Sequence, residues 1–303
     1  MEKAAASAPG KVILFGEHFV VYDKPAIVSA IDLRARVEIS IYSREGVWLR
    51  EKRMSNHPAV RAVEYIVQSK GFSSGLNIKI SSDIPPSVGL GSSASIAVSS
   101  AAAASLIVLG RLDRELVEEA AFEGEKIVHY NPSGIDTTIA LNGMGGLYRR
   151  SIGFTKINIP IEKILIIDTG RMRKTGEMVK RVREYMERNP ERFNELLMIE
   201  EKLVNEALDM FKIGDLEGVG RLMLKNQELL REVGVSSNEI EETVRLALAS
   251  GAYGAKLTGG GGGGCVICLV DEDIMDRVSK NISRFFRTYV VRLLAEGVRE
   301  EKV

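Results

Sequence analysis

Residues 85–94 read Pro-Pro-Ser-Val-Gly-Leu-Gly-Ser-Ser-Ala, and this stretch decides how the fold is interpreted. It follows a strand-like alternation at Leu76, Ile78 and Ile80, and it opens a small-residue run that predicts a helix from about Ser92. Glycines in a turn between a strand and a helix let backbone N–H groups wrap a phosphate chain. The spacing matches neither the P-loop nor the dinucleotide-binding pattern. For this segment alone, a phosphate-binding loop and an ordinary tight connection both remain open.

The segments around this loop predict an α+β fold. Alternation at 37–41 and 76–80 indicates two strands with a helix over 58–70 between them, and a second helix is expected over 113–128. Further along, the pattern predicts strands at 164–167 and 265–270, long charged helices over 176–211, and a helix over 274–286. Because the composition changes near residue 160, we expect two domains, residues 1–160 and 161–303.

Composition excludes several classes of protein. The 303 residues carry 41 Lys and Arg and 41 Asp and Glu, so the overall basic charge of a nucleic-acid-binding protein is missing. Only two cysteines occur, which fits a reducing compartment, and the first residues show no apolar signal segment. Residues 94–109 are apolar but too short and serine-rich to span a bilayer, so we expect a buried helix. A cytoplasmic protein without membrane or nucleic-acid partners is predicted.

Two other groups of ionisable residues could carry chemistry. Lys11, Glu17 and His18 flank an apolar strand, although an early lysine is often at the surface and a single histidine is often structural. Glu125 and Asp136 are separated by a turn that could aim both carboxylates at one site; a solvated glutamate and a turn aspartate are the alternative. The three histidines of the chain do not have zinc-ligand spacing, so any metal is expected to be a hard ion on oxygen ligands.

Another unusual stretch is a run of six glycines at 259–264, which follows Lys256-Leu257-Thr258. Fixing so many glycines costs conformational entropy, which indicates close backbone approach to a ligand or another loop. A flexible linker is the competing interpretation, but linkers usually contain serine as well. Cys265 and Cys268 follow in a C-x-x-C spacing on a predicted strand, and we interpret them as core residues rather than a redox or zinc pair.

Together these motifs resemble those of the GHMP kinases, named for galactokinase, homoserine kinase, mevalonate kinase and phosphomevalonate kinase. The resemblance is carried in order by residues 9–18, 86–93, 131–136 and 256–264. Within that superfamily, residues 11–27 are most similar to the mevalonate kinase family. The resemblance implies a ribosomal-protein-S5-domain-2-like amino-terminal domain, a ferredoxin-like carboxy-terminal domain and an active site between them. It also implies transfer of the γ-phosphoryl group of ATP to the 5-hydroxyl of mevalonate, with Mg²⁺ as cofactor.

The resemblance also implies roles for individual residues. Asp136 would be the catalytic base, with Lys11 beside it, and Ser93 and Glu125 would hold Mg²⁺. The nucleotide would be bound by a loop that comprises Ser87, Val88, Gly89, Leu90, Gly91, Ser92 and Ser93. Mevalonate would be contacted by Glu17, His18, Arg173 and Thr175. The last glycine tract would pack against the nucleotide loop.

These residue types suit phosphoryl transfer, in which positioning and charge neutralisation supply most of the catalysis. An aspartate can accept the proton of an alcohol, and a neighbouring ammonium keeps that aspartate ionised. Three positions depart from the family pattern: Ser87, Tyr130 and Gly260. A kinase for another small alcohol and a non-catalytic nucleotide-binding regulator remain alternatives; the presence of both Lys11 and Asp136 favours an enzyme. The charged helices over 176–231 fit either a solvated surface or a homodimer contact.

Overall fold

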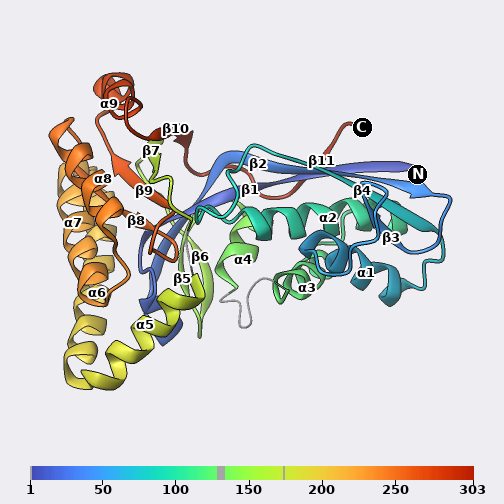
Figure 1. Cartoon of the computed structure of the whole chain (residues 1–303), viewed down its shortest axis with the longest axis horizontal. Helices are drawn as coiled ribbons and strands as arrows, with labels where there is room; N and C mark the ends of the chain where they lie inside the picture. Colours follow the sequence, from blue (N-terminus) through green and yellow to red (C-terminus); the bar gives the residue numbers. More distant parts are fainter. Residues whose placement is uncertain (1, 128–133, 173–174) are drawn as a thin grey trace.

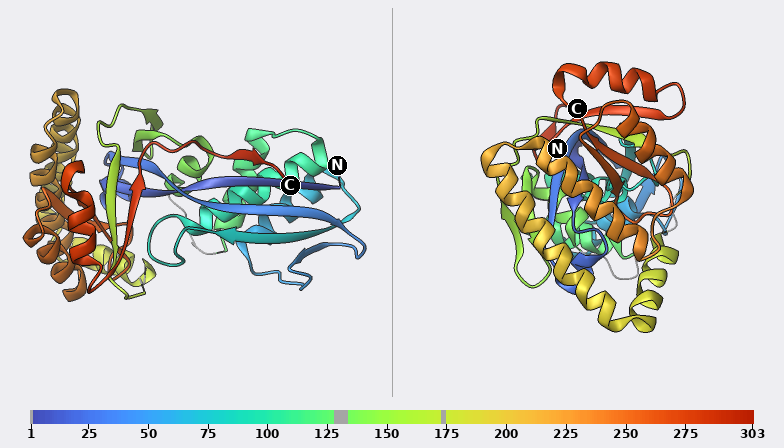
Figure 2. Two further views of the ribbon diagram at one scale, coloured as in Figure 1. Left: turned by 90° about the horizontal axis from the view of Figure 1, so that it is seen from above. Right: turned by 90° about the vertical axis from the view of Figure 1, so that its left-hand side faces the viewer.

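The structure, a computed structural model, describes residues 2–127, 134–172 and 175–303. It contains two sheets, each with its own helices, and a long hairpin runs from one group to the other (Figure 1). The hairpin consists of β1 (Lys3–Phe15) and β2 (Ala26–Tyr42), which pair antiparallel along nearly their whole length. The views in Figure 2 show the molecule elongated along this hairpin.

The first sheet has the order β11-β1-β2-β4-β3. In addition, β5 pairs with β2, and β6 pairs with β5. Its remaining strands are β3 (Val47–Leu49), β4 (Gly75–Ser82), β5 (Gly145–Arg149), β6 (Gly153–Lys156) and β11 (Arg299–Glu301). Four helices lie on one side of it in Figure 1: α1 (Pro58–Lys70), α2 (Ser92–Leu109), α3 (Arg114–Glu125) and α4 (Ile135–Asn142). Because β11 pairs with β1, the end of the chain returns to the first sheet.

Helix α2 is buried, as the sequence predicts for residues 94–109. Small side chains allow neighbouring elements to approach it from several directions, and two of its buried serines donate to backbone carbonyls of the hairpin. Ser95 Oγ donates to the Pro9 carbonyl at 2.6 Å and Ser99 Oγ to the Ala35 carbonyl at 2.9 Å. The helix is long and apolar enough to cross a membrane, but 72% of it is buried inside the protein. We therefore interpret α2 as the buried core helix that packs against the first sheet.

The second sheet is antiparallel, with the order β10-β7-β9-β8. It is formed by β7 (Lys163–Asp168), β8 (Gly254–Thr258), β9 (Cys265–Leu269) and β10 (Arg287–Arg292). Its helices are α5 (Thr175–Arg188), α6 (Pro190–Ile213), α7 (Leu216–Glu232), α8 (Asn238–Ala249) and α9 (Met275–Ile282). The helical segment expected over 176–211 is two helices, because Pro190 has no N–H to continue α5 and starts α6 instead.

The α+β class is confirmed, and the predicted strands and helices are present with shifted ends. The strand expected at 37–41 is the end of the much longer β2, and the helix expected over 274–286 ends at Ile282. Cys265 and Cys268 are buried in β9, and burial raises the pKa of the Cys268 thiol to about 12. A thiol of that kind stays protonated and packs as an apolar group, as expected for core cysteines.

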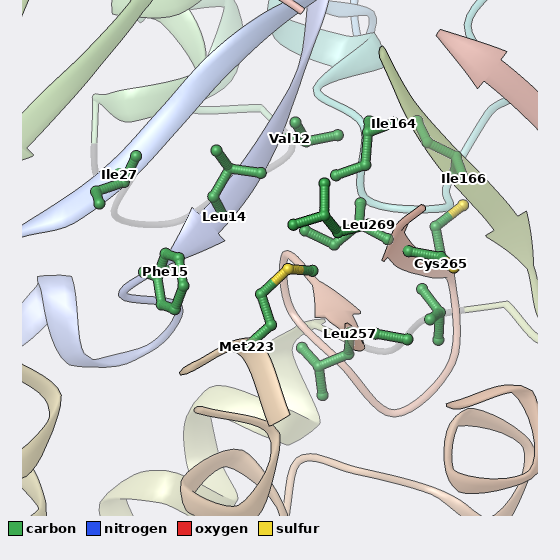
Figure 3. Packing of buried hydrophobic residues seen from close by; sticks show 14 of the residues in the cluster. Val12, Leu14, Phe15, Ile27, Ile164, Ile166, Met223, Leu257, Cys265 and Leu269 are labelled. Atoms are coloured by element: carbon green, nitrogen blue, oxygen red, sulfur yellow. The ribbon is translucent and has the colours of Figure 1, made fainter. Parts of the chain in front are cut away.

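One hydrophobic core joins the end of the hairpin to the second sheet (Figure 3). Side chains from β1 and β2 approach those of β7, β8 and β9, with one residue of α7 between them. The labelled members are Val12, Leu14, Phe15, Ile27, Ile164, Ile166, Met223, Leu257, Cys265 and Leu269. Because the packing is continuous, the residues at the end of β1 are held at a fixed place against the second sheet.

Candidate active site

Strand β1 places Lys11 beneath the glycine-containing loop. Its side chain is 3% exposed; Nζ donates to the Gly89 carbonyl at 3.1 Å and forms an ion pair with Asp136 Oδ1 at 3.3 Å. The Lys11 backbone N–H donates to the Leu90 carbonyl at 2.9 Å. Asp136 stands in the first turn of α4 and is 26% exposed, so its carboxylate is open to a ligand. One ammonium thus joins the loop to a carboxylate far away in the sequence.

The loop itself alternates left-handed and ordinary backbone conformations. Ser87, Gly89 and Gly91 have φ values of 62°, 102° and 76°. Such alternation turns successive N–H groups inward and creates a concave anion-binding nest. Gly91 is the N-cap of α2, and a Cβ added there would lie 3.0 Å from Lys11 Cγ, so the loop can follow the lysine closely only with glycine at this position. Ser87, which departs from the family pattern, still adopts the positive φ that glycine prefers.

Two oxygen-bearing side chains meet at the start of α2. Ser93 Oγ donates to Glu125 Oε1 at 2.5 Å, and Glu125, at the end of α3, is 2% exposed. A hydroxyl and a carboxylate at the mouth of a phosphate loop are the hard oxygen ligands that Mg²⁺ prefers, with phosphates and waters as its further ligands. The donor set therefore fits a magnesium ion.

The six-glycine tract packs against the loop, as the resemblance implies. The Cys265 N–H donates to the Val88 carbonyl at 3.1 Å, and a Cβ added to Gly264 would lie only 2.6 Å from that oxygen. On the other side, Thr258 Oγ1 accepts from the Ile13 N–H at 2.9 Å and donates to the Ile13 carbonyl at 3.1 Å. The tract is therefore a packing surface between the loop and β1, and the linker interpretation is wrong.

The turn after β1 carries His18 to the same tract. His18 has a φ of 64°, and its Nε2 lies 3.0 Å from the Gly260 carbonyl. Burial lowers the pKa of His18 to about 4, so near neutral pH the ring is uncharged and Nε2–H donates to that carbonyl. Thr175, the first residue of α5, lies beside Gly260, because a Cβ added to Gly260 would be 3.0 Å from Thr175 Oγ1. Arg173 and Tyr130 lie outside the described residues.

Glu17 faces inward instead of lining this surface. Its side chain is fully buried and forms an ion pair with Lys256 of β8, so in this structure the carboxylate is not on a wall that a substrate could touch. A direct contact between Glu17 and a substrate stays a prediction that this placement does not support. Lys256 and the buried Glu200 of α6 also lie at the site, although the sequence motifs do not indicate a role for either. The signal was a charged residue on an otherwise apolar helical stripe, between Leu196 and Leu203.

An apolar groove of about 610 Å³ opens beside the loop. Its walls come from β3, β4, the residues after them and the start of α2, and two basic side chains lie among them. The lining includes Leu49, Arg50, Lys52, Met54, Ile80, Ile84, Pro86, Ser92 and Ile96. A mostly apolar groove that ends at a phosphate nest suits a flat base attached to a phosphate chain. No local sequence pattern predicts this groove, because separate elements contribute to it.

Two family models match the chain. The GHMP kinases N terminal domain matches residues 57–144, and the GHMP kinases C terminal model matches residues 201–288. The class of protein that the fold and the site define is therefore the GHMP kinases.

Individual relatives narrow the class. The mevalonate kinase of Aeropyrum pernix is 36% identical, with both chains covered in full. The crystal structure of L. major mevalonate kinase in complex with R-mevalonate has a TM-score of 0.84 and 30% identity, covering 98% of this chain and 97% of that one. The mevalonate kinase of Methanococcus jannaschii has a TM-score of 0.84 at 31% identity, covering 96% and 98%. The chain belongs to the mevalonate kinase family.

A matched pair of glycine substitutions tests the packing of the tract on the loop. Gly264 and Gly234 both have a φ of 80°, but only Gly264 faces a neighbouring carbonyl at short range. We expect Gly264→Ala to raise KM for ATP about tenfold or more, because its Cβ displaces Val88 and hence the nest, whereas Gly234→Ala carries the same backbone strain and leaves that KM near the wild-type value. Steady-state kinetics at varied ATP measures this, and equal KM values in the two variants would contradict the packing role.

Proposed function

We propose that this protein transfers the γ-phosphoryl group of ATP to the 5-hydroxyl of mevalonate at the site described above. Its family makes it an ATP-dependent kinase, and its mevalonate kinase relatives support mevalonate as the substrate. The assignment of residue roles rests on one observation. A buried ammonium, that of Lys11, touches both the carbonyl of the phosphate-binding loop and the carboxylate of Asp136. That arrangement brings a donor phosphate and an acceptor hydroxyl to opposite sides of the same lysine.

Asp136 is the group that takes the proton of the alcohol. A primary alcohol is a weak nucleophile near neutral pH, and a carboxylate in hydrogen-bond reach removes its proton as the new P–O bond forms. The Lys11 ammonium, 3.3 Å away, favours the ionised form of the aspartate and offsets the negative charge that develops on the transferring oxygens. The partial exposure of Asp136 lets the substrate reach it.

We assign nucleotide binding to the glycine-containing loop and the apolar groove. Backbone N–H groups of the loop from Ser87 to Ser93, at the N-terminus of α2, bind the phosphates, and the groove beside Pro86 and Ser92 takes the base and ribose. Ser93 and Glu125 would hold Mg²⁺, which supplies charge neutralisation on the phosphates when it is bound.

His18 and Thr175 bind the acceptor. Because Nε2–H of the neutral His18 ring donates to the Gly260 carbonyl, Nδ1 is unprotonated and can accept a hydrogen bond from a substrate hydroxyl. Thr175 Oγ1 lies beside the same glycine and supplies a second polar contact. Arg173, close to Thr175 in the sequence, is assigned to the substrate carboxylate, a role that suits a guanidinium. The balanced charge of the chain and its apolar cysteines fit a cytoplasmic enzyme.

Substrate identity is tested by incubating the purified protein with ATP, Mg²⁺ and, separately, mevalonate, phosphomevalonate, homoserine and galactose. Mass spectrometry of the products is expected to show one added phosphate on mevalonate. Phosphate only on another alcohol would contradict the substrate assignment, and the absence of any phosphorylated product would favour a non-catalytic nucleotide-binding protein.

The role of Asp136 is tested with Asp136→Asn, which keeps the shape of the side chain but removes the base. We expect kcat to fall by about 10²- to 10⁴-fold, as is typical for loss of a general base, while the affinity for ATP changes little. Asp209→Asn, at an exposed position of α6, is the matched control and is expected to keep wild-type kcat. Rapid-quench kinetics with separate nucleotide titrations measures both quantities, and near-normal turnover in Asp136→Asn would remove it from the proposed role.

A further inference from the structure

Three polar side chains outside the proposed reaction are fully buried where the hairpin meets the second sheet: Glu200 of α6, Asn226 of α7 and Lys256 of β8. Lys256 and Glu200 interact with Glu17, and Asn226 interacts with Glu200. Lys256 Nζ pairs with Glu17 Oε1 and donates to the Leu257 carbonyl at 2.8 Å, and Asn226 Nδ2 donates to Glu200 Oε2 at 2.5 Å. Buried charges are costly unless they are paired, so the charge balance of this cluster has consequences.

The cluster holds more acceptors than donors. Within the described ranges of the chain, Glu17 Oε2, Glu200 Oε1 and Asn226 Oδ1 have no hydrogen-bond partner. Two carboxyl groups also share the single ammonium of Lys256. A proton on one carboxyl removes the excess negative charge and adds a donor where acceptors are in surplus. Burial raises the pKa of Glu17 and lowers that of Lys256, but their direct ion pair opposes both shifts. Glu200 Oε1 has no such partner among the described residues, so we place the proton on Glu200.

The electrostatics of Glu200 agree with this placement. Burial and, after it, the neighbouring Glu17 carboxylate raise the pKa of Glu200, whereas Lys256 and Asn226 lower it; the resulting pKa is about 8. Lys11 also faces Glu17 and Lys256 from β1, and the His18 ring beside them is uncharged near neutral pH. Near neutral pH, therefore, the cluster consists of an ion pair and a neutral carboxylic acid.

Helix α6 holds the residues on both sides of Glu17. The Gly16 backbone amide faces the Glu200 carboxyl and favours its charged form. Beyond the turn, the Phe193 ring lies 4.9 Å from the Tyr22 ring and 6.3 Å from the Phe19 ring. Gly16 itself has no space to shift toward Ala26, because an added Cβ would be 2.5 Å from it. The turn 16–18, which ends in His18, is thus fixed by α6 on one side and by Lys256 on the other.

We propose that Glu200 is a positioning residue whose protonated carboxyl group holds the turn 16–18, and through it His18, in the orientation that binds the acceptor alcohol. Ionisation places a second negative charge beside Glu17, where Lys256 is already paired with Glu17 and Lys11 with Asp136. The repulsion from Glu17 is stronger than the gain at the Gly16 amide, so it displaces the turn. The affinity for the acceptor then depends on a proton that no substrate contacts. The inference rests on the proposed function only for the identity of the acceptor.

The kinetic test compares wild type with Glu200→Gln, whose amide resembles the protonated acid and cannot ionise. With a pKa of about 8, about one molecule in eleven keeps the proton at about pH 9, so KM for mevalonate should rise about tenfold between about pH 7 and pH 9 in wild type. In Glu200→Gln that rise should be absent, and KM for ATP should be alike in both proteins. Glu206→Gln on the same helix is the control and should keep the wild-type profile. An equal alkaline rise in Glu200→Gln would overturn the proposal.

A second arm needs no substrate and stands even where mevalonate is not phosphorylated. Glu200 has an unfolded pKa near 4.5 and a folded pKa near 8, so its contribution to stability is full below the first value and is lost as pH rises through the second. The Tm of Glu200→Gln relative to wild type should therefore increase from about pH 6 to about pH 9. A constant difference would show that Glu200 carries no proton and would contradict the proposal, whereas failure of mevalonate turnover alone would contradict only the proposed function.

Discussion

The candidate active site depends on one buried ammonium with two partners. Lys11 lies on β1, where its Nζ reaches the carbonyl of Gly89 and the carboxylate of Asp136. A buried lysine requires both contacts, since an unpaired ammonium away from water is strongly unfavourable. The same contacts fix the glycine-containing loop and the first turn of α4 relative to each other. The charge that the proposed catalysis requires is thus also what holds the site together.

The rest of the fold keeps that lysine in place. The core in Figure 3 continues from the end of the hairpin into the second sheet, and Thr258 joins the two through Ile13. The glycine tract then returns to the loop through Cys265 and Val88. Backbone contacts of this kind leave no room for side chains, which explains why six glycines are tolerated despite their entropic cost. Main-chain contacts therefore connect the glycine-containing loop and β1 to the second sheet.

The sequence predicted the parts of this site that have a local signature. The glycine-containing loop before a small-residue helix, the α+β class and the core placement of Cys265 and Cys268 all follow from patterns within a few residues. The groove beside the loop and the cluster of Glu17, Glu200 and Lys256 do not, because each joins side chains from several elements. Glu200 is unusual in the sequence because it is a charged residue on an apolar helical stripe. Its neighbours in the cluster, however, come from other elements and are identified only in the structure. The division near residue 160 stays a prediction.

A double-mutant cycle on kcat/KM for Lys11→Met and Asp136→Asn tests most directly whether these two groups act on one reacting oxygen. If they do, the second substitution costs little once the first has been made, so the double variant should be close to the slower single variant. Losses that multiply independently in the double variant would show that the lysine and the aspartate work at separate places, and would contradict the account.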